Sequence, residues 1–299
     1  MTRPGFLIIT VVACVLGTSV AAVCGYGPQW ALALTTAVLA VCMHAAANVI
    51  NDYHDALNGA DAANDQGLFP FTGGARLIQN GQVTPHDTYR LAKALLMCVL
   101  PAGGVMAVYT GGGLIGLGAL GILLGWGYST PPLMLMSRGL GELTVALTWG
   151  LVVVGADYVQ RGQFDWIPAA VALSYALLVG NILIINGFPD ARSDAQVGKR
   201  TLVVRLGARG AAGLYFFWAV LAHAWVVWGV WELIHPEPVL WGLLSLPLSV
   251  AAAILLWHQR RETQQLKTAI VTTIAASVVQ GLSLTVALFM LASSRAGTV

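Results

Sequence analysis

Charged side chains are scarce in this chain. Asp, Glu, Lys and Arg make up only 9% of its 299 residues, whereas soluble domains carry about 25%. Apolar residues make up 57%, and the mean hydropathy is +0.75. A chain of this size with so few charges has too little polar surface for a fold surrounded by water. The composition therefore predicts a single membrane-embedded domain that spans residues 1–299.

The sequence also lacks the signals of several common function classes. Its four cysteines form no C-x-x-C pair, which argues against a thiolate metal site. The formal net charge of +2 is too small to indicate binding of nucleic acid. Segment 111–118 has glycine spacings like those of a dinucleotide-binding loop, but no strand flanks it. Close packing of membrane helices explains these glycines better.

Long apolar runs dominate what is present. A transmembrane helix needs about 20 mostly apolar residues, and a lipid-exposed span of that length must satisfy its backbone groups internally, as a helix does. The first run is too long for the apolar part of a signal peptide, so an uncleaved helix is expected. The sequence thus predicts an all-α polytopic protein with nine spans, at roughly 6–24, 29–50, 92–109, 111–133, 140–157, 166–187, 212–231, 238–257 and 268–292.

The basic residues support this count. If the N-terminus lies inside, the inside segments hold 13 of the 15 Lys and Arg residues, and the outside segments hold only Arg161 and Arg295. Positive residues favour cytoplasmic loops. We therefore expect a cytoplasmic N-terminus, an external C-terminus and two long cytoplasmic loops, at 51–91 and 188–211. Long loops are usually functional, so the chemistry is expected on the cytoplasmic side.

The first of these loops begins with an acidic cluster. If the second span continues through it, Asn48, Asp52 and Asp55 are spaced i, i+4 and i+7, which places them on one helical face. Asp61 follows shortly afterwards. His44 lies one turn before Asn48 and is expected to be a hydrogen-bonded histidine of the helix bundle.

The second loop begins with a matching cluster. Asn186, Asp190 and Asp194 are spaced i, i+4 and i+8, again at the cytoplasmic end of a span. Pro189 lies among them and cannot donate an intrahelical hydrogen bond. A kink or a helix end is therefore predicted at this position.

Two facing acidic clusters predict a cation site. Oxygen ligands suit Mg²⁺, which typically binds one or two carboxylates together with substrate phosphates. Arg76, Lys199 and Arg200 follow the clusters and could neutralise diphosphate oxygens, although the bias of basic residues towards inside loops would also explain them. Solvated loop charges, or a cation-coupled membrane transporter, are the alternative interpretations of the acidic clusters.

Several motifs resemble one known family. Residues 51–55 (NDYHD) with 59–61 (GAD) resemble the first Asp-rich motif of the UbiA superfamily of intramembrane prenyltransferases. Residues 190–194 (DARSD) with 198–202 (GKRTL) resemble the second, and 128–132 (YSTPP) with 140–142 (LGE) resemble the central segment. The first motif looks most like that of the 1,4-dihydroxy-2-naphthoate prenyltransferases. Two departures are Ala56, where an acidic residue is frequent, and segment 187–189 (GFP).

The resemblance implies nine helices around a central cavity, capped by two cytoplasmic loops, in a bacterial or archaeal cell membrane. It implies a polyprenyl diphosphate as donor and a small aromatic acceptor, 1,4-dihydroxy-2-naphthoate in menaquinone synthesis. The alternative acceptors are 4-hydroxybenzoate and another phenolic or lipid molecule. Tyr128 could stabilise an allylic cation through its ring, or could be an interfacial aromatic. The implied Mg²⁺ ligands are Asp52, Asp55, Asp61, Asp190 and Asp194, and the implied diphosphate ligands are Asn48, Arg76, Lys199 and Arg200.

Overall fold

The computed structural model describes residues 1–69 and 71–296. Within this part the regular structure is helical and contains no strand, which confirms the predicted all-α class. The α-helices are α1 (Pro4–Val23), α2 (Trp30–Asn58), α3 (Ala60–Ala63), α4 (Pro85–Thr110), α5 (Gly113–Gly127), α6 (Gly141–Arg161), α7 (Ile167–Gln196), α8 (Leu202–Trp231), α9 (Leu246–Gln259) and α10 (Leu266–Ala296). Short 3-10 helices are η1 (Leu135–Arg138), η2 (Glu237–Ser245) and η3 (Thr263–Gln265).

Each predicted span corresponds to one apolar helical segment of the structure. In the described residues, eight segments are long and apolar enough to cross a membrane, with η2 and α9 together forming one of them. The ninth, α5, is shorter, because it ends at Gly127 rather than near residue 133. Pro131 and Pro132 follow it, and proline cannot extend a helix by backbone donation. The chain is an integral membrane protein.

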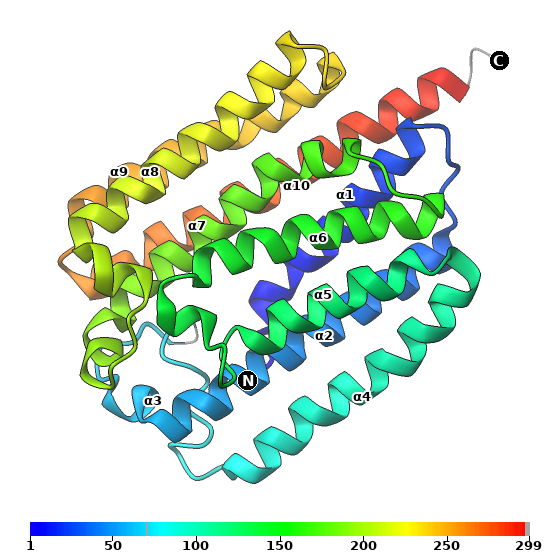
Figure 1. Cartoon of the computed structure of the whole chain (residues 1–299). Helices are drawn as coiled ribbons and strands as arrows, with labels where there is room; N and C mark the ends of the chain where they lie inside the picture. The colour runs from blue at the N-terminus through cyan, green and yellow to red at the C-terminus, as the bar shows by residue number, and fades with distance from the viewer. Residues whose placement is uncertain (70, 297–299) are drawn as a thin grey trace.

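The long helices run side by side, and the short helix α3 lies at one end of the bundle (Figure 1). Helix α6 packs against both α1 and α7, and α2 packs against α4. The main core cluster joins α1, α6, α7 and α10 through buried residues such as Leu16, Val153 and Tyr175. Gly17 permits the close approach of α1 to α6, because a side chain at this position would collide with the backbone of Val153.

Helices α2 and α7 extend past the C-terminal ends of their predicted spans. Helix α2 continues to Asn58, and Gly59 ends it in the left-handed conformation at φ 83°. Helix α7 continues through Pro189 to Gln196, so the predicted helix end at Pro189 is wrong. The predicted long loop at 188–211 is also wrong, because only residues 197–201 separate α7 from α8. Hydropathy falls where the polar residues begin, but the helices continue past that point. Several of these polar residues line a pocket.

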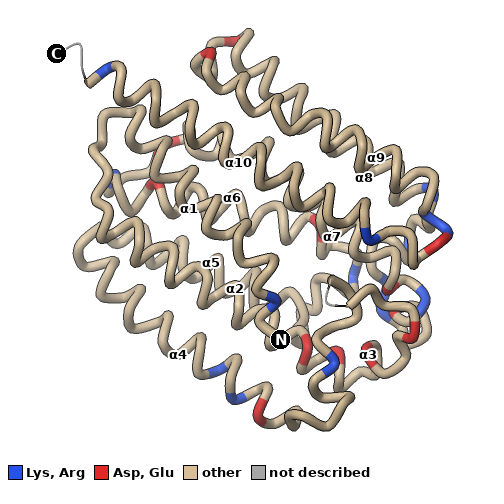
Figure 2. Tube along the Cα trace, turned by 180° about the vertical axis from the view of Figure 1, so that it is seen from behind, with Lys and Arg blue, Asp and Glu red and all other residues tan. Residues whose placement is uncertain are grey.

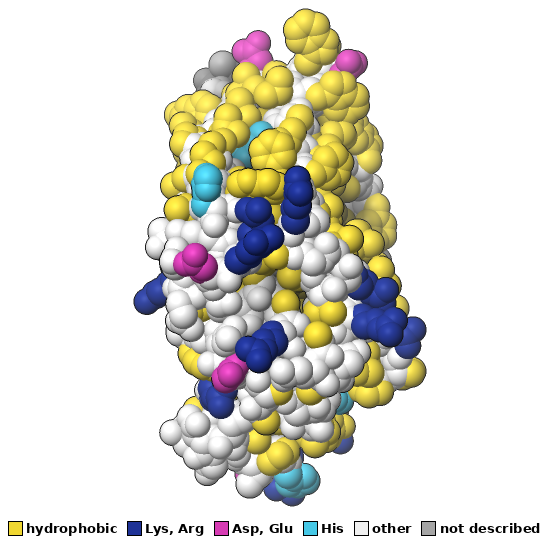
Figure 3. Space-filling view, turned by 90° about the vertical axis from the view of Figure 1, so that its left-hand side faces the viewer, with side chains coloured by type: hydrophobic (Ala, Val, Ile, Leu, Met, Phe, Trp, Pro, Cys, Tyr) yellow, Lys and Arg dark blue, Asp and Glu magenta, His cyan; other side chains and the backbone are white. Residues whose placement is uncertain are grey.

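Charged residues gather at the end of the bundle that contains α3 (Figure 2). The N-terminus lies near that end, and the described chain finishes at the opposite end (Figure 1). A view towards the α3 end shows scattered Lys and Arg side chains among polar and backbone atoms, with hydrophobic side chains above them (Figure 3). This asymmetry agrees with the uneven distribution of basic residues that the sequence predicts for the two membrane sides.

Candidate functional site

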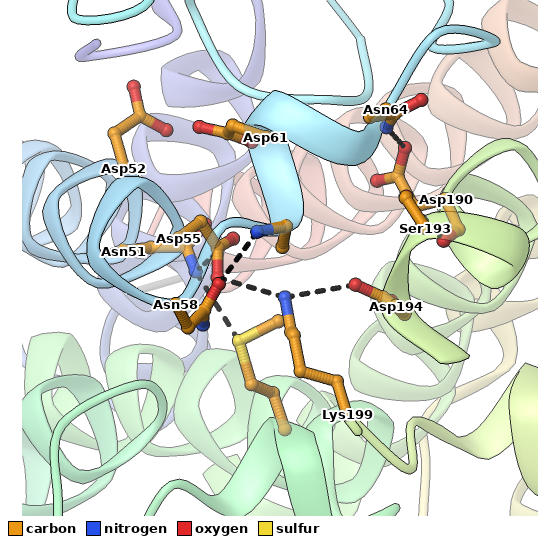
Figure 4. Close-up of polar contacts among 12 residues, drawn as sticks. Asn51, Asp52, Asp55, Asn58, Asp61, Asn64, Asp190, Ser193, Asp194 and Lys199 are labelled. Carbon is orange, nitrogen blue, oxygen red and sulfur yellow. Dashed lines mark hydrogen bonds and ion pairs between the residues drawn. The ribbon is translucent and has the colours of Figure 1, made fainter. Parts of the chain in front are cut away.

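The helical extensions of α2 and α7 bring the two acidic clusters together around one lysine (Figure 4). Lys199 Nζ donates to Asp55 Oδ1 at 2.9 Å and lies 3.1 Å from Asp194 Oδ1. All three side chains are largely buried. A buried ammonium between two carboxylates offsets charges that would otherwise repel each other in a medium of low dielectric constant. The predicted clusters therefore form one site, joined by Lys199.

Asp52 belongs to the same site but is held by a different cation. Arg3 donates from one terminal nitrogen to Asp52 Oδ1 at 2.8 Å and to Asn51 Oδ1 at 3.1 Å. The amino group of Met1 is 4.0 Å from Asp52 Oδ2. Asn51 in turn donates to Asp55 Oδ2 at 3.1 Å, so it links the two acids of α2.

The segment after α2 closes the site from above. Asn64 donates to Asp190 Oδ1 at 2.7 Å, and the backbone N–H of Gly73 donates to Asp190 Oδ2 at 3.3 Å. Asp61, on α3, is buried and accepts a hydrogen bond from Gln79 at 3.3 Å. Residues 59–69 and 71–84 therefore form a cap that is tied directly to Asp190 of α7; we call this segment the cap loop.

Three predicted diphosphate ligands, Asn48, Arg76 and Arg200, lie outside the polar pocket that acids of both clusters line. Asn48 lines the neighbouring apolar cavity and donates to the carbonyl of Thr2 at 3.1 Å. Arg76 donates to the carbonyl oxygens of Asn64 at 2.7 Å and Asp61 at 3.3 Å, and its guanidinium lies over the ring of Phe69. Arg200 is exposed, and its backbone N–H donates to the carbonyl of Ser137. In this structure both arginines hold loops around the site instead of facing into it, so their predicted contact with diphosphate stays a prediction.

The electrostatics of the cluster follow from burial and crowding. The pKa of Asp61 is raised to about 8, first by burial and then by the negative charges of Asp55 and Asp52. Burial alone would lower the pKa of Lys199, but the charges of Asp55 and Asp194 outweigh it and raise that pKa above its ordinary value. The site therefore retains Lys199 as a cation while it still carries excess negative charge.

Two connected cavities meet at the site. A polar pocket of about 80 Å³ is lined by acids of both clusters and by Lys199. An apolar cavity of about 500 Å³ extends from it between α1, α2, α4, α5, α6 and α7. Five residues line both spaces: Arg3, Asn51, Tyr128, Leu183 and Asn186. A ligand with a charged head and an apolar body can thus occupy both spaces with its junction beside Tyr128.

The donor set suits a hard divalent cation. The polar pocket includes carboxylate and amide oxygens, the kind of ligand that Mg²⁺ prefers. Asn186 Oδ1 is buried without a hydrogen-bond partner and Asn186 lines the pocket, which leaves an acceptor oxygen for a ligand. Within residues 1–69 and 71–296, no three His, Cys, Asp or Glu side chains already converge as a metal site. Instead, Lys199 bridges Asp55 and Asp194, and Arg3 pairs with Asp52.

Sequence reasoning missed four residues of this site. The sequence indicates Arg3 only as one of the basic residues on the inner side of the membrane. It does not indicate Asn51 or Asn64 as ligands. Glu142 lies in the first turn of α6 and is buried, and it also lines the polar pocket. The signal for Asn51 was available, because it lies one helical turn before Asp55. Nothing in the spacing places Arg3 beside Asp52, because that contact joins residues 49 positions apart.

Comparisons with known proteins agree with this architecture. The model of the UbiA prenyltransferase family matches residues 9–278. The chain is 33% identical over 252 residues to the 1,4-dihydroxy-2-naphthoate octaprenyltransferase of Mycobacterium tuberculosis. The aligned region covers 84% of this chain and 82% of that relative.

Solved structures share the fold at low identity. The apo structure of a UbiA homolog from Aeropyrum pernix K1 superposes with a TM-score of 0.71 at 18% identity, covering 96% of this chain and 99% of that one. A UbiA homolog from Archaeoglobus fulgidus bound to DMAPP and Mg²⁺ gives a TM-score of 0.62 at 15% identity, covering 96% and 98%. The chain belongs to the UbiA prenyltransferase family.

Proposed function

We propose that this protein transfers a polyprenyl group from a polyprenyl diphosphate to 1,4-dihydroxy-2-naphthoate, in a Mg²⁺-dependent reaction. The observation that carries the proposal is the junction of the two cavities. A pocket with acids from both clusters opens beside Tyr128 into an apolar space of about 500 Å³. This arrangement matches a molecule with a diphosphate head and an isoprenoid tail.

The acids and the cations of the site have different roles in binding the diphosphate head. Asp52, Asp55, Asp190 and Asp194 would hold Mg²⁺, which neutralises diphosphate charge when it is bound and so stabilises the leaving group. Lys199 and Arg3 lie in the same pocket. Both can donate charge-assisted hydrogen bonds to the diphosphate oxygens. Asp61, with its raised pKa, lies where additional positive charge would restore its ionised form.

The apolar cavity would protect the reacting carbon. Departure of diphosphate leaves positive charge on the allylic carbon, and water would capture it. A cavity walled mainly by aliphatic residues and glycine excludes water. The ring of Tyr128 lies at the mouth of this cavity, where its π-face can stabilise positive charge.

The acceptor is inferred from similarity. The relative from Mycobacterium tuberculosis is named for transfer to 1,4-dihydroxy-2-naphthoate, and 33% identity over most of both chains supports the same acceptor here. The first Asp-rich motif also resembles that branch. A cation-coupled transporter is disfavoured, because transport sites lie near the midplane whereas these acids lie at the α3 end of the bundle (Figure 2).

An acceptor panel tests the proposal. Purified protein would receive Mg²⁺, a polyprenyl diphosphate and either 1,4-dihydroxy-2-naphthoate or 4-hydroxybenzoate, and the products would be identified by mass spectrometry. The expected result is a prenylated naphthalene that has lost its carboxylate. Efficient prenylation of 4-hydroxybenzoate with none of the naphthoate would assign the chain to the hydroxybenzoate branch instead.

A further inference from the structure

The wall of the apolar cavity has two different sides. The side formed by α4 and α5 consists, among the described lining residues, of aliphatic side chains, methionine, alanine and glycine. The side formed by α1, α2 and α6 also carries polar groups, namely Thr10, Thr36, His44, Asn48, Asn51, Thr144, Thr148 and Trp149. An isoprenoid tail has no groups that could hydrogen-bond to a polar wall. A hydroxylated aromatic ring needs one, so the two sides suit the two substrates.

Most polar groups on that wall are already hydrogen-bonded within the protein. The hydroxyl of Thr144 donates to the carbonyl of Leu140 at 2.8 Å, and that of Thr148 donates to the carbonyl of Thr144 at 2.7 Å. The hydroxyl of Thr36 likewise donates to Leu32 at 2.7 Å. These three threonines therefore offer little to a ligand.

His44 is the exception. Its Nδ1 lies 2.8 Å from Thr10 Oγ1, and its ring meets the ring of Trp149 edge-on with centroids 4.9 Å apart. These two contacts fix the orientation of the imidazole. Its Nε2 makes no hydrogen bond to any described residue, and the side chain lines the cavity. Trp149 Nε1, in the same wall, is buried without a partner.

A buried histidine elsewhere in the protein shows the contacts of a histidine with a purely structural role. His223, on α8, uses both ring nitrogens: Nδ1 lies 2.8 Å from the carbonyl of Ala219, and Nε2 lies 2.9 Å from Ser245 Oγ. It does not line either described cavity at the site. His44 differs from it in having one nitrogen bound and one nitrogen left for the cavity.

The position of His44 fits the geometry of transfer. It precedes Asp52 by eight residues on α2, which corresponds to about 12 Å along the helix axis. That interval accommodates the diphosphate, the allylic carbon and one aromatic ring. Asn48 lies between the two positions and also lines the cavity.

We propose that His44 binds a hydroxyl of the aromatic acceptor through Nε2 and takes its proton during transfer, while the contact between Nδ1 and Thr10 Oγ1 holds the ring in place. The inference rests on the proposed prenyl transfer and adds the subsite and base for its acceptor. A neutral imidazole whose Nε2 faces the cavity can accept a hydrogen bond from that hydroxyl, and imidazole is the side chain that most often serves as a general base.

The bonds and charges in the step balance. A π-electron pair of the ring forms the C–C bond to the allylic carbon, and the C–O bond to diphosphate breaks with its electrons leaving on oxygen. The proton of the hydroxyl beside the attacked carbon passes to His44 Nε2, which leaves a ketone. When the attacked carbon carries the carboxylate, the product is a β-keto acid, which loses CO₂ and takes the proton back from His44.

Steady-state kinetics of two His44 variants test the assignment. His44→Phe removes both nitrogens and should lower kcat/KM for the acceptor by about 10²-fold, the lower end of a lost general base, while KM for the donor stays unchanged. His44→Gln keeps a polar atom near the Nε2 position. It should recover the acceptor KM, but kcat should remain low. Thr10→Val should give an intermediate loss in kcat. His223→Gln, the matched buried histidine, should leave the acceptor KM unchanged.

A binding measurement separates recognition from fold damage. The two monomethyl ethers of the dihydroxynaphthoate, each blocking one hydroxyl, would be compared as competitive inhibitors. Unmodified protein should bind one ether more weakly, and His44→Phe should bind both equally. Equal losses for donor and acceptor, or the same ether preference in both proteins, would overturn the role of His44. Unmodified protein that prenylates no arene would contradict the proposed function itself, and this inference with it.

Discussion

Lys199 and Asp55 meet at 2.9 Å although 144 positions separate them in the sequence. The same ammonium is 3.1 Å from Asp194, so one cation joins Asp55 of α2 to Asp194 of α7. A diphosphate that enters with Mg²⁺ must compete with this bridge. Once divalent cations neutralise the two acids, we expect Lys199 to leave this bridge and donate to the phosphate oxygens.

Removing the charge of Lys199 should impair use of the donor. A charge-assisted hydrogen bond contributes about 1.5–3 kcal/mol, so Lys199→Met should lower kcat/KM for the polyprenyl diphosphate by about 10- to 150-fold. Lys267→Met is the matched control, because Lys267 is exposed on α10. Kinetics with each substrate varied in turn would measure both. A defect confined to the aromatic acceptor would refute the assignment.

The same variant should destabilise the protein when Mg²⁺ is absent. Lys199→Met leaves Asp55 and Asp194 buried without their shared counter-charge, and breaking a buried ion pair costs about 3–5 kcal/mol. Thermal unfolding in detergent with EDTA would show a lowered Tm. Adding Asp55→Asn to Lys199→Met should recover part of the loss, since one uncompensated charge is then gone. Unchanged unfolding of the single variant would mean that the bridge does not form in solution.

Arg76 should act through the cap loop. Its guanidinium donates to the carbonyl oxygens of Asp61 and Asn64, so Arg76→Gln should loosen the segment that reaches Asp190 through Asn64. Limited digestion with chymotrypsin should then cut faster near Phe69 and Phe71, and the donor KM should rise. Arg90→Gln removes an exposed charge on α4 and serves as the control. A raised donor KM with unchanged digestion would instead favour direct contact with diphosphate.

Membrane orientation follows from the distribution of basic residues. The inside segments of the nine-span arrangement hold 13 of the 15 basic residues, which predicts a cytoplasmic N-terminus and an external C-terminus. Reporter fusions at about residues 80, 163, 200 and 299 should report inside, outside, inside and outside. Fusions at 80 and 200 on opposite sides would contradict the arrangement.

The sequence predicted the helices well because span length and charge alternation are strong physical constraints. It predicted Asp52, Asp55, Asp190 and Asp194 as one site because their spacings match helical faces. The predicted span end near residue 187 and the predicted loop at 188–211 were wrong, since hydropathy marks where a helix leaves lipid and not where it ends. Arg3 could not be placed, because a contact between distant segments leaves no trace in local spacing.

The most direct test of the account is Mg²⁺-dependent prenyl transfer by Asp190→Asn. Asp190 is held by Asn64 and Gly73 at the meeting point of α7 and the cap loop, whereas Asp65 is exposed in the same loop and provides the control. Transfer by the unmodified protein and by Asp65→Asn should require Mg²⁺. Asp190→Asn should lower turnover at least about 10²-fold, the scale of losing one preorganised electrostatic group. Full activity in EDTA, or normal turnover by Asp190→Asn, would contradict the assignment of the acidic clusters to the diphosphate.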